Sequence, residues 1–185
     1  MTLLAKVCLL GNGKVGKTSL INRYLGKGFS SEYTPTLGSD FLSKQVSLDT
    51  IYGLKKLRFQ IWDLAGQPAF NQVRKLYYKG AAGAFIVFDL TNPSLVDLER
   101  WLKEFSKNIK LHSSSVTVLG NKLDLTDEIK ITPNTLRNYI DNNLINRFSN
   151  VDPRIDYYST SAKDGTNVDL AFSTLGGRII EKLYQ

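Results

Sequence analysis

Short apolar segments alternate with amphipathic segments along almost the whole chain. The apolar runs predict buried strands over residues 6–10, 83–89, 116–119 and 155–160. Apolar positions that recur with helical spacing predict helices over residues 19–25, up to 78, from 93, from 133 and over 168–183. Asn92-Pro93 and Thr132-Pro133 are expected to cap the third and fourth of these helices.

Two further segments, residues 41–48 and 54–62, alternate apolar and polar side chains. The short connection around Gly53 predicts that they pair as an antiparallel hairpin at a sheet edge. Strands that alternate with helices are typical of a parallel sheet. The sequence therefore predicts an α/β fold with a mostly parallel six-stranded sheet, one antiparallel edge strand and flanking helices.

The length of 185 residues suits one domain with a substantial core, so we expect a single domain over residues 1–185. The one cysteine, Cys8, lies in an apolar strand and cannot form an internal disulfide, which indicates an intracellular protein. The sequence has no signal-peptide pattern and no apolar run of transmembrane length. We expect a cytoplasmic monomer that becomes peripheral to membranes where a native tail or a partner provides an anchor.

The net charge of +7, from 24 basic and 17 acidic residues, favours anionic partners. These include nucleotides, acidic proteins and, through weak contact, anionic membranes. Scattered solvated lysines are an equally favoured explanation. Nucleic acid is not expected as a partner, because the sequence has no basic run with interleaved aromatic residues.

A glycine-rich motif, Gly-Asn-Gly-Lys-Val-Gly-Lys-Thr, occupies residues 11–18 between the first predicted strand and the first predicted helix. Its spacing fits a P-loop, whose backbone N–H groups and following helix N-terminus bind phosphate. Lys17 is then expected to reach the outer phosphates, and Thr18 to bind Mg²⁺. An ordinary glycine-rich turn is the alternative, and the motif alone does not distinguish a GTPase from an ATPase or a kinase.

Asp63 ends the second strand of the hairpin, where a carboxylate can bind Mg²⁺. Gly66 follows three residues later, and its N–H is expected to reach a terminal phosphate. A simple turn at the strand end would give the same Asp-x-x-Gly pattern. The Asp-x-x-Gly pattern indicates a nucleotide site here because it lies downstream of a P-loop.

The segment 121–124, Asn-Lys-Leu-Asp, follows another buried strand and predicts a site for a purine base. The carboxylate of Asp124 can accept hydrogen bonds from both donors on the edge of guanine, a donor pair that adenine lacks. Asn121 is expected to bridge this loop to the P-loop, and the stem of Lys122 to cover the purine face.

The segment Ser161-Ala162-Lys163 follows the last predicted strand. The Ala162 N–H is expected to donate to the guanine carbonyl and so to complete the base site. Each of these motifs can occur by chance. Four motifs in this order, each at the C-terminal end of a strand, predict one nucleotide site at that edge of the sheet.

With these motifs the chain resembles the Ras superfamily of small GTPases, and the Rab family most closely, over nearly its whole length. The resemblance implies the P-loop NTPase fold of small G proteins and a GTP/GDP switch that uses Mg²⁺ and hydrolyses GTP slowly. It also implies an exchange factor, a GTPase-activating protein, effectors and a role in intracellular membrane trafficking. The effector and the pathway cannot be identified from the sequence.

The resemblance assigns roles to individual positions. Catalysis is expected from Gln67, which orients the attacking water, with Lys17 and Thr36. Mg²⁺ is expected on Thr18, on Thr36 and, through water, on Asp63. The residues expected to contact the nucleotide are Gly13, Lys14, Val15, Gly16, Lys17, Thr18, Ser19, Phe29, Tyr33, Thr36, Gly66, Asn121, Lys122, Asp124, Ser161, Ala162 and Lys163.

The likeness to the Rab family rests on residues 37–41, Trp62-Asp63 and residues 77–80. Within these segments Phe41, Trp62 and Tyr77 match the aromatic trio with which Rab proteins contact effectors. Simple packing between the hairpin and the following loop is the alternative, and it is compatible with an effector surface.

Pro68 departs from the family pattern, which has an acid at this position. A proline disfavours helical φ and ψ for the residue before it, here Gln67. The alternative function is therefore a GTP-binding interaction module with negligible hydrolysis; a P-loop ATPase or kinase is a weaker alternative, which the segment 121–124 argues against. Lys14 is expected either to lie close to a phosphate or to be solvated. The interval between Asp124 and Ser161 is longer than in Ras, and no purpose is assigned to it.

Overall fold

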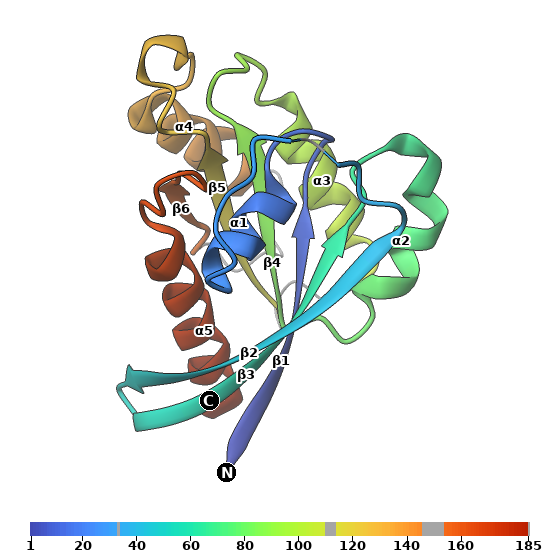
Figure 1. Cartoon of the computed structure of the whole chain (residues 1–185). Coiled ribbons are helices and arrows are strands. Elements are labelled where there is room, and N and C mark those ends of the chain that lie inside the picture. Colours follow the sequence, from blue (N-terminus) through green and yellow to red (C-terminus); the bar gives the residue numbers. More distant parts are fainter. Residues whose placement is uncertain (33, 110–113, 146–153, 185) are drawn as a thin grey trace.

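The computed structural model describes residues 1–32, 34–109, 114–145 and 154–184. A six-stranded sheet with the order β2-β3-β1-β4-β5-β6 runs through the molecule (Figure 1). The strands are β1 (Thr2–Leu10), β2 (Ser39–Thr50), β3 (Gly53–Leu64), β4 (Gly83–Asp89), β5 (Ser115–Asn121) and β6 (Asp156–Ser159). β2 is antiparallel to β3 and the other neighbouring pairs are parallel, which confirms the predicted fold class.

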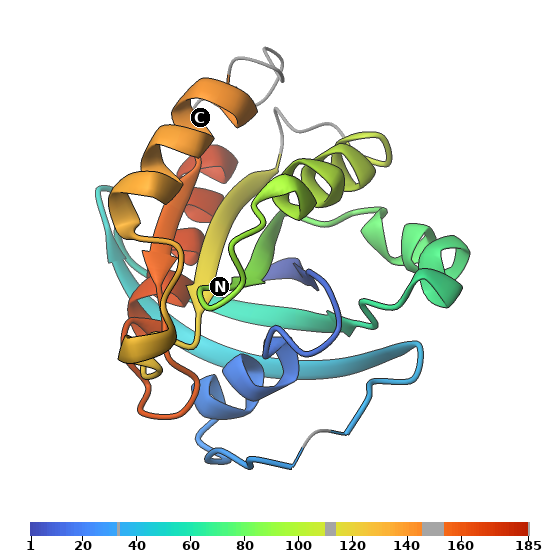
Figure 2. The same cartoon turned by 90° about the horizontal axis from the view of Figure 1, so that it is seen from above.

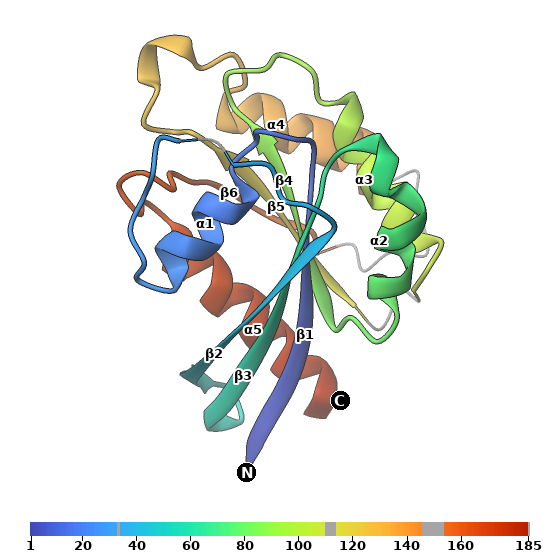
Figure 3. The same cartoon turned by 45° about the vertical axis from the view of Figure 1, so that its right-hand side comes forward.

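Five α-helices flank the sheet in the part of the chain that the structure describes. They are α1 (Lys17–Tyr24), α2 (Asn71–Tyr78), α3 (Val96–Ser106), α4 (Pro133–Tyr139) and α5 (Val168–Tyr184). One buried cluster joins α1 and α5 to one face of the sheet, and a second joins α3, α4 and the end of α2 to the other (Figure 3). None of the described helices is both long enough and apolar enough to cross a membrane.

The sequence pattern explains the positions of the strands. Every residue of β5 is buried, and β4 is buried up to its last residue, as expected for central parallel strands with helices on both faces. In β3, Leu57, Phe59 and Ile61 are buried while Arg58 between them is exposed, so one face of the hairpin lies against the core. The hairpin strands are longer at both ends than the predicted segments.

The two predicted helix caps have different outcomes. The Oγ1 of Thr132 accepts a hydrogen bond from the Thr135 N–H at 3.2 Å, which confirms the cap of α4. The cap at Asn92-Pro93 is wrong, because α3 begins only at Val96. The side chain of Asn92 instead accepts from the Ser94 N–H, and this local turn competes with a helical start.

The contact between α5 and the hairpin depends on a glycine. A Cβ on Gly176 would lie 2.6 Å from Leu48 and 2.9 Å from Phe59, both on the hairpin. The neighbouring Gly177 has no atom within 4 Å of the position of its Cβ. Substitutions at the two adjacent glycines therefore test different effects. A change at Gly176 tests the packing of α5 against the hairpin, and a change at Gly177 tests helix propensity alone.

We predict that Gly176→Val lowers the free energy of unfolding by about 1–3 kcal/mol, because the side chain would force α5 away from the hairpin. Gly177→Ala, the control, is expected to raise it by about 0.5–1 kcal/mol, because alanine favours the helix. Urea unfolding under fixed solution conditions measures both. A Gly176→Val variant as stable as wild type would mean that α5 does not pack closely here.

Candidate functional site

The P-loop follows β1 and leads into α1, at the end of the sheet viewed from above in Figure 2. Gly16, the residue before α1, has φ of 95°, in the left-handed region that favours glycine. A Cβ at Gly16 would also collide with the side chain of Asn121. The motif glycine is therefore required both by its backbone conformation and by the close approach of Asn121 at the end of β5.

Lys17 is buried, and its ammonium lies inside the P-loop. Nζ donates to the carbonyl oxygens of Gly11 at 2.9 Å and Asn12 at 2.8 Å. Burial lowers the pKa of Lys17 to about 8, and the nearby Asp63 carboxylate partly opposes this effect. The carbonyl contacts fix a cation in the loop without neutralising it, and such a cation favours an anion nearby.

Three oxygen-bearing side chains from distant parts of the chain meet beside Lys17. The Thr18 hydroxyl donates to Asp63 Oδ2 at 2.5 Å and lies 3.1 Å from the hydroxyl of Thr36, which is 3.4 Å from the same carboxylate oxygen. Burial raises the pKa of Asp63, although hydrogen bonds from Thr18 and the charge of Lys17 act in the other direction. The loop between α1 and β2, which passes around the outside of α1 in Figure 2, thus brings Thr36 to the P-loop.

This cluster fits a hard divalent cation such as Mg²⁺. Among the described residues none donates a hydrogen bond to Asp63 Oδ1, although this oxygen is buried. A buried carboxylate oxygen without a partner is costly, and hydroxyl and carboxylate oxygens are ligands that Mg²⁺ accepts. The donor set therefore supports the metal residues predicted from the sequence.

Gly66 lies against the P-loop. A Cβ at this position would collide with the backbone of Gly11, Asn12 and Gly13. The neighbouring Ala65 N–H donates to Gly38 O at 2.9 Å, which attaches the loop after β3 to the start of β2. The geometry brings Gly66 and Gly13 together, as expected for two residues that contact one phosphate chain.

The predicted base-binding residues also converge. Asn121 Nδ2 donates to Val15 O at 2.9 Å, so the loop after β5 is bridged to the P-loop as expected. Asp124 accepts from the Ser161 hydroxyl at 2.7 Å, which orients its carboxylate. The Ala162 N–H, expected to face a guanine carbonyl, donates to Asn121 Oδ1 at 3.2 Å.

Lys122 is held by a contact that the sequence did not predict. Its φ is 70°, and its ammonium forms an ion pair with Asp89, the last residue of β4, at 2.6 Å. Partial burial acts to raise the pKa of Asp89, but hydrogen bonds from Lys122 and Thr91 outweigh it and keep the pKa below its usual value. The ion pair fixes the stem that is expected to cover the purine.

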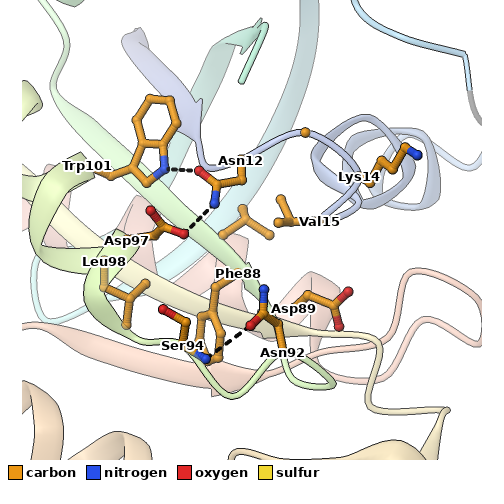
Figure 4. A pocket seen from close by; sticks show the side chains of 12 residues that line it. Asn12, Lys14, Val15, Phe88, Asp89, Asn92, Ser94, Asp97, Leu98 and Trp101 are labelled. Atoms are coloured by element: carbon orange, nitrogen blue, oxygen red, sulfur yellow. Dashed lines mark hydrogen bonds between the residues drawn. The ribbon is translucent and has the colours of Figure 1, made fainter. Parts of the chain in front are cut away.

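Three of the predicted nucleotide residues are less closely tied to this cluster, and a fourth cannot be placed. Phe29 is 44% exposed in the loop between α1 and β2. The side chain of Lys14 points away from Asn12 in Figure 4, and its φ is 66°. Lys163 is exposed and contributes its carbonyl to Arg23. Tyr33 lies outside the described residues.

Gln67 has φ of −73° and ψ of 144°, which is an extended conformation. The expected effect of Pro68 on the preceding backbone is therefore confirmed. Pro68 itself begins a short 3-10 helix, Pro68–Phe70, that leads into α2.

The aromatic trio is a contiguous group. The ring centroids are 5.1 Å apart between Phe41 and Trp62, and 4.8 Å apart between Trp62 and Tyr77. Phe41 is 49% exposed, whereas the other two are partly buried against the core. The three rings thus pack together and still present surface between the hairpin and α2.

Sequence reasoning missed a second set of contacts, behind the P-loop. Figure 4 shows a pocket between the P-loop and the start of α3, in which Asn12 Oδ1 accepts from Trp101 Nε1 at 3.0 Å. Asn12 Nδ2 donates to Asp97 Oδ2 at 2.5 Å. Asp97 and Trp101 are four residues apart and so share a helix face, which is the signal that could have indicated a polar partner.

Comparison with known proteins agrees with this geometry. The Ras family model matches residues 6–181. Ras-related protein Rab-8B from Pongo abelii is 35% identical over 184 residues, which cover 97% of this chain and 80% of the relative. Ras-related protein Rab7 from Drosophila melanogaster is 37% identical over 183 residues, which cover 96% of this chain and 81% of the relative. Ras-related protein Rab-7a from Paramecium octaurelia is 34% identical over 176 residues, which cover 93% of this chain and 79% of the relative. The chain therefore belongs to the Ras family and is a Rab-like small GTPase.

Proposed function

We propose that this protein is a GTP/GDP switch that binds Mg²⁺ with the nucleotide, hydrolyses GTP slowly and recruits effectors in membrane trafficking. The observation that carries the proposal is the meeting of Thr18 and Thr36 at the buried carboxylate of Asp63. Thr36 comes from a loop in which its two neighbours, Pro35 and Leu37, are exposed. A ligand that binds at this point can therefore order that loop and change the surface offered to partners.

Each part of the nucleotide has residues suited to it. Lys17 and the backbone of residues 13–18 would bind the phosphates, and Asp124 with its orienting Ser161 would select guanine. Phe29 and the stem of Lys122 would cover the two faces of the base. Mg²⁺ on Thr18, Thr36 and, through water, Asp63 would neutralise charge on the phosphate oxygens.

Hydrolysis requires water to attack the γ-phosphorus while the bond to the β-phosphate oxygen breaks, giving GDP and phosphate. Gln67 would orient this water, and Lys17 would stabilise charge on the oxygens of the transferred group. We assign none of the described arginines as an internal arginine finger. An arginine supplied by a partner would raise the hydrolysis rate by about 10³- to 10⁵-fold. A GTPase-activating protein is therefore a proposed partner, together with an exchange factor.

The extended backbone of Gln67 supports a second candidate function. Pro68 holds the glutamine in a conformation outside the helical region, so water can be poorly oriented even with GTP fully bound. The protein would then act as a GTP-dependent binding module with negligible intrinsic hydrolysis. The aromatic trio at Phe41, Trp62 and Tyr77 would serve effectors in both cases.

Base selection gives the first test of the proposal. Asp124→Asn is expected to weaken GTP binding by about 100-fold or more and to favour xanthosine triphosphate, because an amide donor suits the additional carbonyl of xanthine. Asp127→Asn, an exposed acid three residues later, is the matched control and should bind GTP as wild type does. Calorimetry with both nucleotides measures this, and unchanged GTP affinity in Asp124→Asn would exclude Asp124 as the base-reading residue.

Single-turnover hydrolysis of bound GTP separates the two candidate functions. Gly13→Val is expected to slow hydrolysis by about 10- to 100-fold with nucleotide affinity retained, because the side chain would crowd the space beside Gly66. Pro68→Glu should preserve or raise the rate. A wild-type rate at the background of free GTP, unchanged in both variants, would favour the binding module over the slow GTPase.

A further inference from the structure

A buried arginine of α2 holds the loop that carries Gly66 and Gln67. Arg74 is 2% exposed, and all five of its N–H donors have acceptors. One terminal nitrogen donates to Ala65 O and to Gln67 O, both at 2.9 Å, and the other donates to Asn71 and Glu104. Nε donates to the same Glu104 carboxylate at 3.1 Å.

The partner of this cation, Glu104, belongs to α3. Partial burial acts to raise its pKa, but hydrogen bonds from Arg74 and Tyr78 outweigh this and keep the pKa below its usual value. The Tyr78 hydroxyl donates to Glu104 Oε1 at 2.5 Å. The carboxylate is thus charged at neutral pH, and it fixes Arg74 through a bidentate ion pair.

The two carbonyls that Arg74 binds are on either side of Gly66. A trans peptide unit is planar, so its C=O and its N–H point in opposite directions. Since Arg74 binds the oxygen of the Ala65–Gly66 peptide, the Gly66 N–H must point away from the guanidinium. The Ala65 N–H belongs to the preceding peptide and is held by Gly38 O, so both peptide units that meet at Ala65 are fixed by hydrogen bonds.

α3 also fixes the other side of the contact between Gly66 and the P-loop. The guanidinium of Arg74 lies 4.6 Å from the ring centroid of Trp101. The indole N–H of Trp101 donates to Asn12 (Figure 4). The backbone of Asn12 lies directly against Gly66. One helix therefore positions both the loop after β3 and the P-loop backbone it contacts.

We propose that Arg74, held by Glu104, is a positioning residue that fixes the Gly66 peptide so that its N–H can bind the γ-phosphate. This inference rests on the proposed function and deepens it. GDP has no γ-phosphate, so Arg74 should contribute to the affinity for GTP and not to that for GDP. Arg74 thereby sets how strongly the protein distinguishes its two nucleotides.

The test compares affinities for guanylyl imidodiphosphate, a GTP analogue that is not hydrolysed, and for GDP, both with Mg²⁺. In Arg74→Ala the ratio of analogue affinity to GDP affinity should fall by about 10- to 100-fold, as expected for a lost hydrogen bond to a charged group. Arg74→Lys should give a smaller fall, because one ammonium cannot bind two carbonyls and a carboxylate together. Arg58→Ala, an exposed arginine of β3, is the control and should leave the ratio unchanged.

Glu104→Gln keeps an acceptor but removes the charge that holds Arg74, so it should lower the ratio in the same direction. It decides the question if Arg74→Ala does not fold. An unchanged ratio in variants that bind GDP normally, or an equal loss of both nucleotides, would overturn the role of Arg74. Failure of wild type to bind the analogue would instead overturn the proposed function.

Discussion

A buried carboxylate needs charge or hydrogen bonds to offset its lost hydration, and the site is arranged around this need at Asp63. Its Oδ2 accepts hydrogen bonds from the hydroxyls of Thr18 and Thr36. The charge of Lys17 favours the ionised carboxylate as a whole. Among the described residues none donates a hydrogen bond to Oδ1. A cation and an anion added together would satisfy both Asp63 and Lys17. The proposed Mg²⁺ and nucleotide would therefore also compensate the buried charges of the site.

The parallel sheet makes this arrangement possible. The C-terminal ends of β1, β3, β4, β5 and β6 lie at one edge, and residues at or just after each of these ends contribute to the site. α3 supports these loops in two ways. Trp101 donates to Asn12 of the P-loop, and Glu104 binds Arg74, which in turn binds two carbonyls of the loop after β3. One helix therefore supports both loops, directly at the P-loop and through Arg74 at the loop after β3.

Much of the fold and of the candidate site could be predicted from the sequence. Periodicity gave the order of the elements, and the motifs at strand ends converge because the C-terminal ends of parallel strands share an edge. The start of α3 was harder to predict. The Asn92 side chain accepts a hydrogen bond from the Ser94 N–H, and this local turn competes with the helix, which begins at Val96. The network of Arg74 escaped prediction because periodicity indicates which helix face is buried, but not that a distant carboxylate permits an arginine there.

Affinity for nucleotide with and without free Mg²⁺ tests whether Thr18, Thr36 and Asp63 hold a metal ion. Calorimetric titration of the wild-type protein with guanylyl imidodiphosphate would be carried out first in Mg²⁺ and then in excess chelator. We expect chelation to weaken binding by at least about tenfold, because Asp63 would then face the phosphates without a cation between them. Equal affinities under the two conditions would contradict the role assigned to Thr18, Thr36 and Asp63.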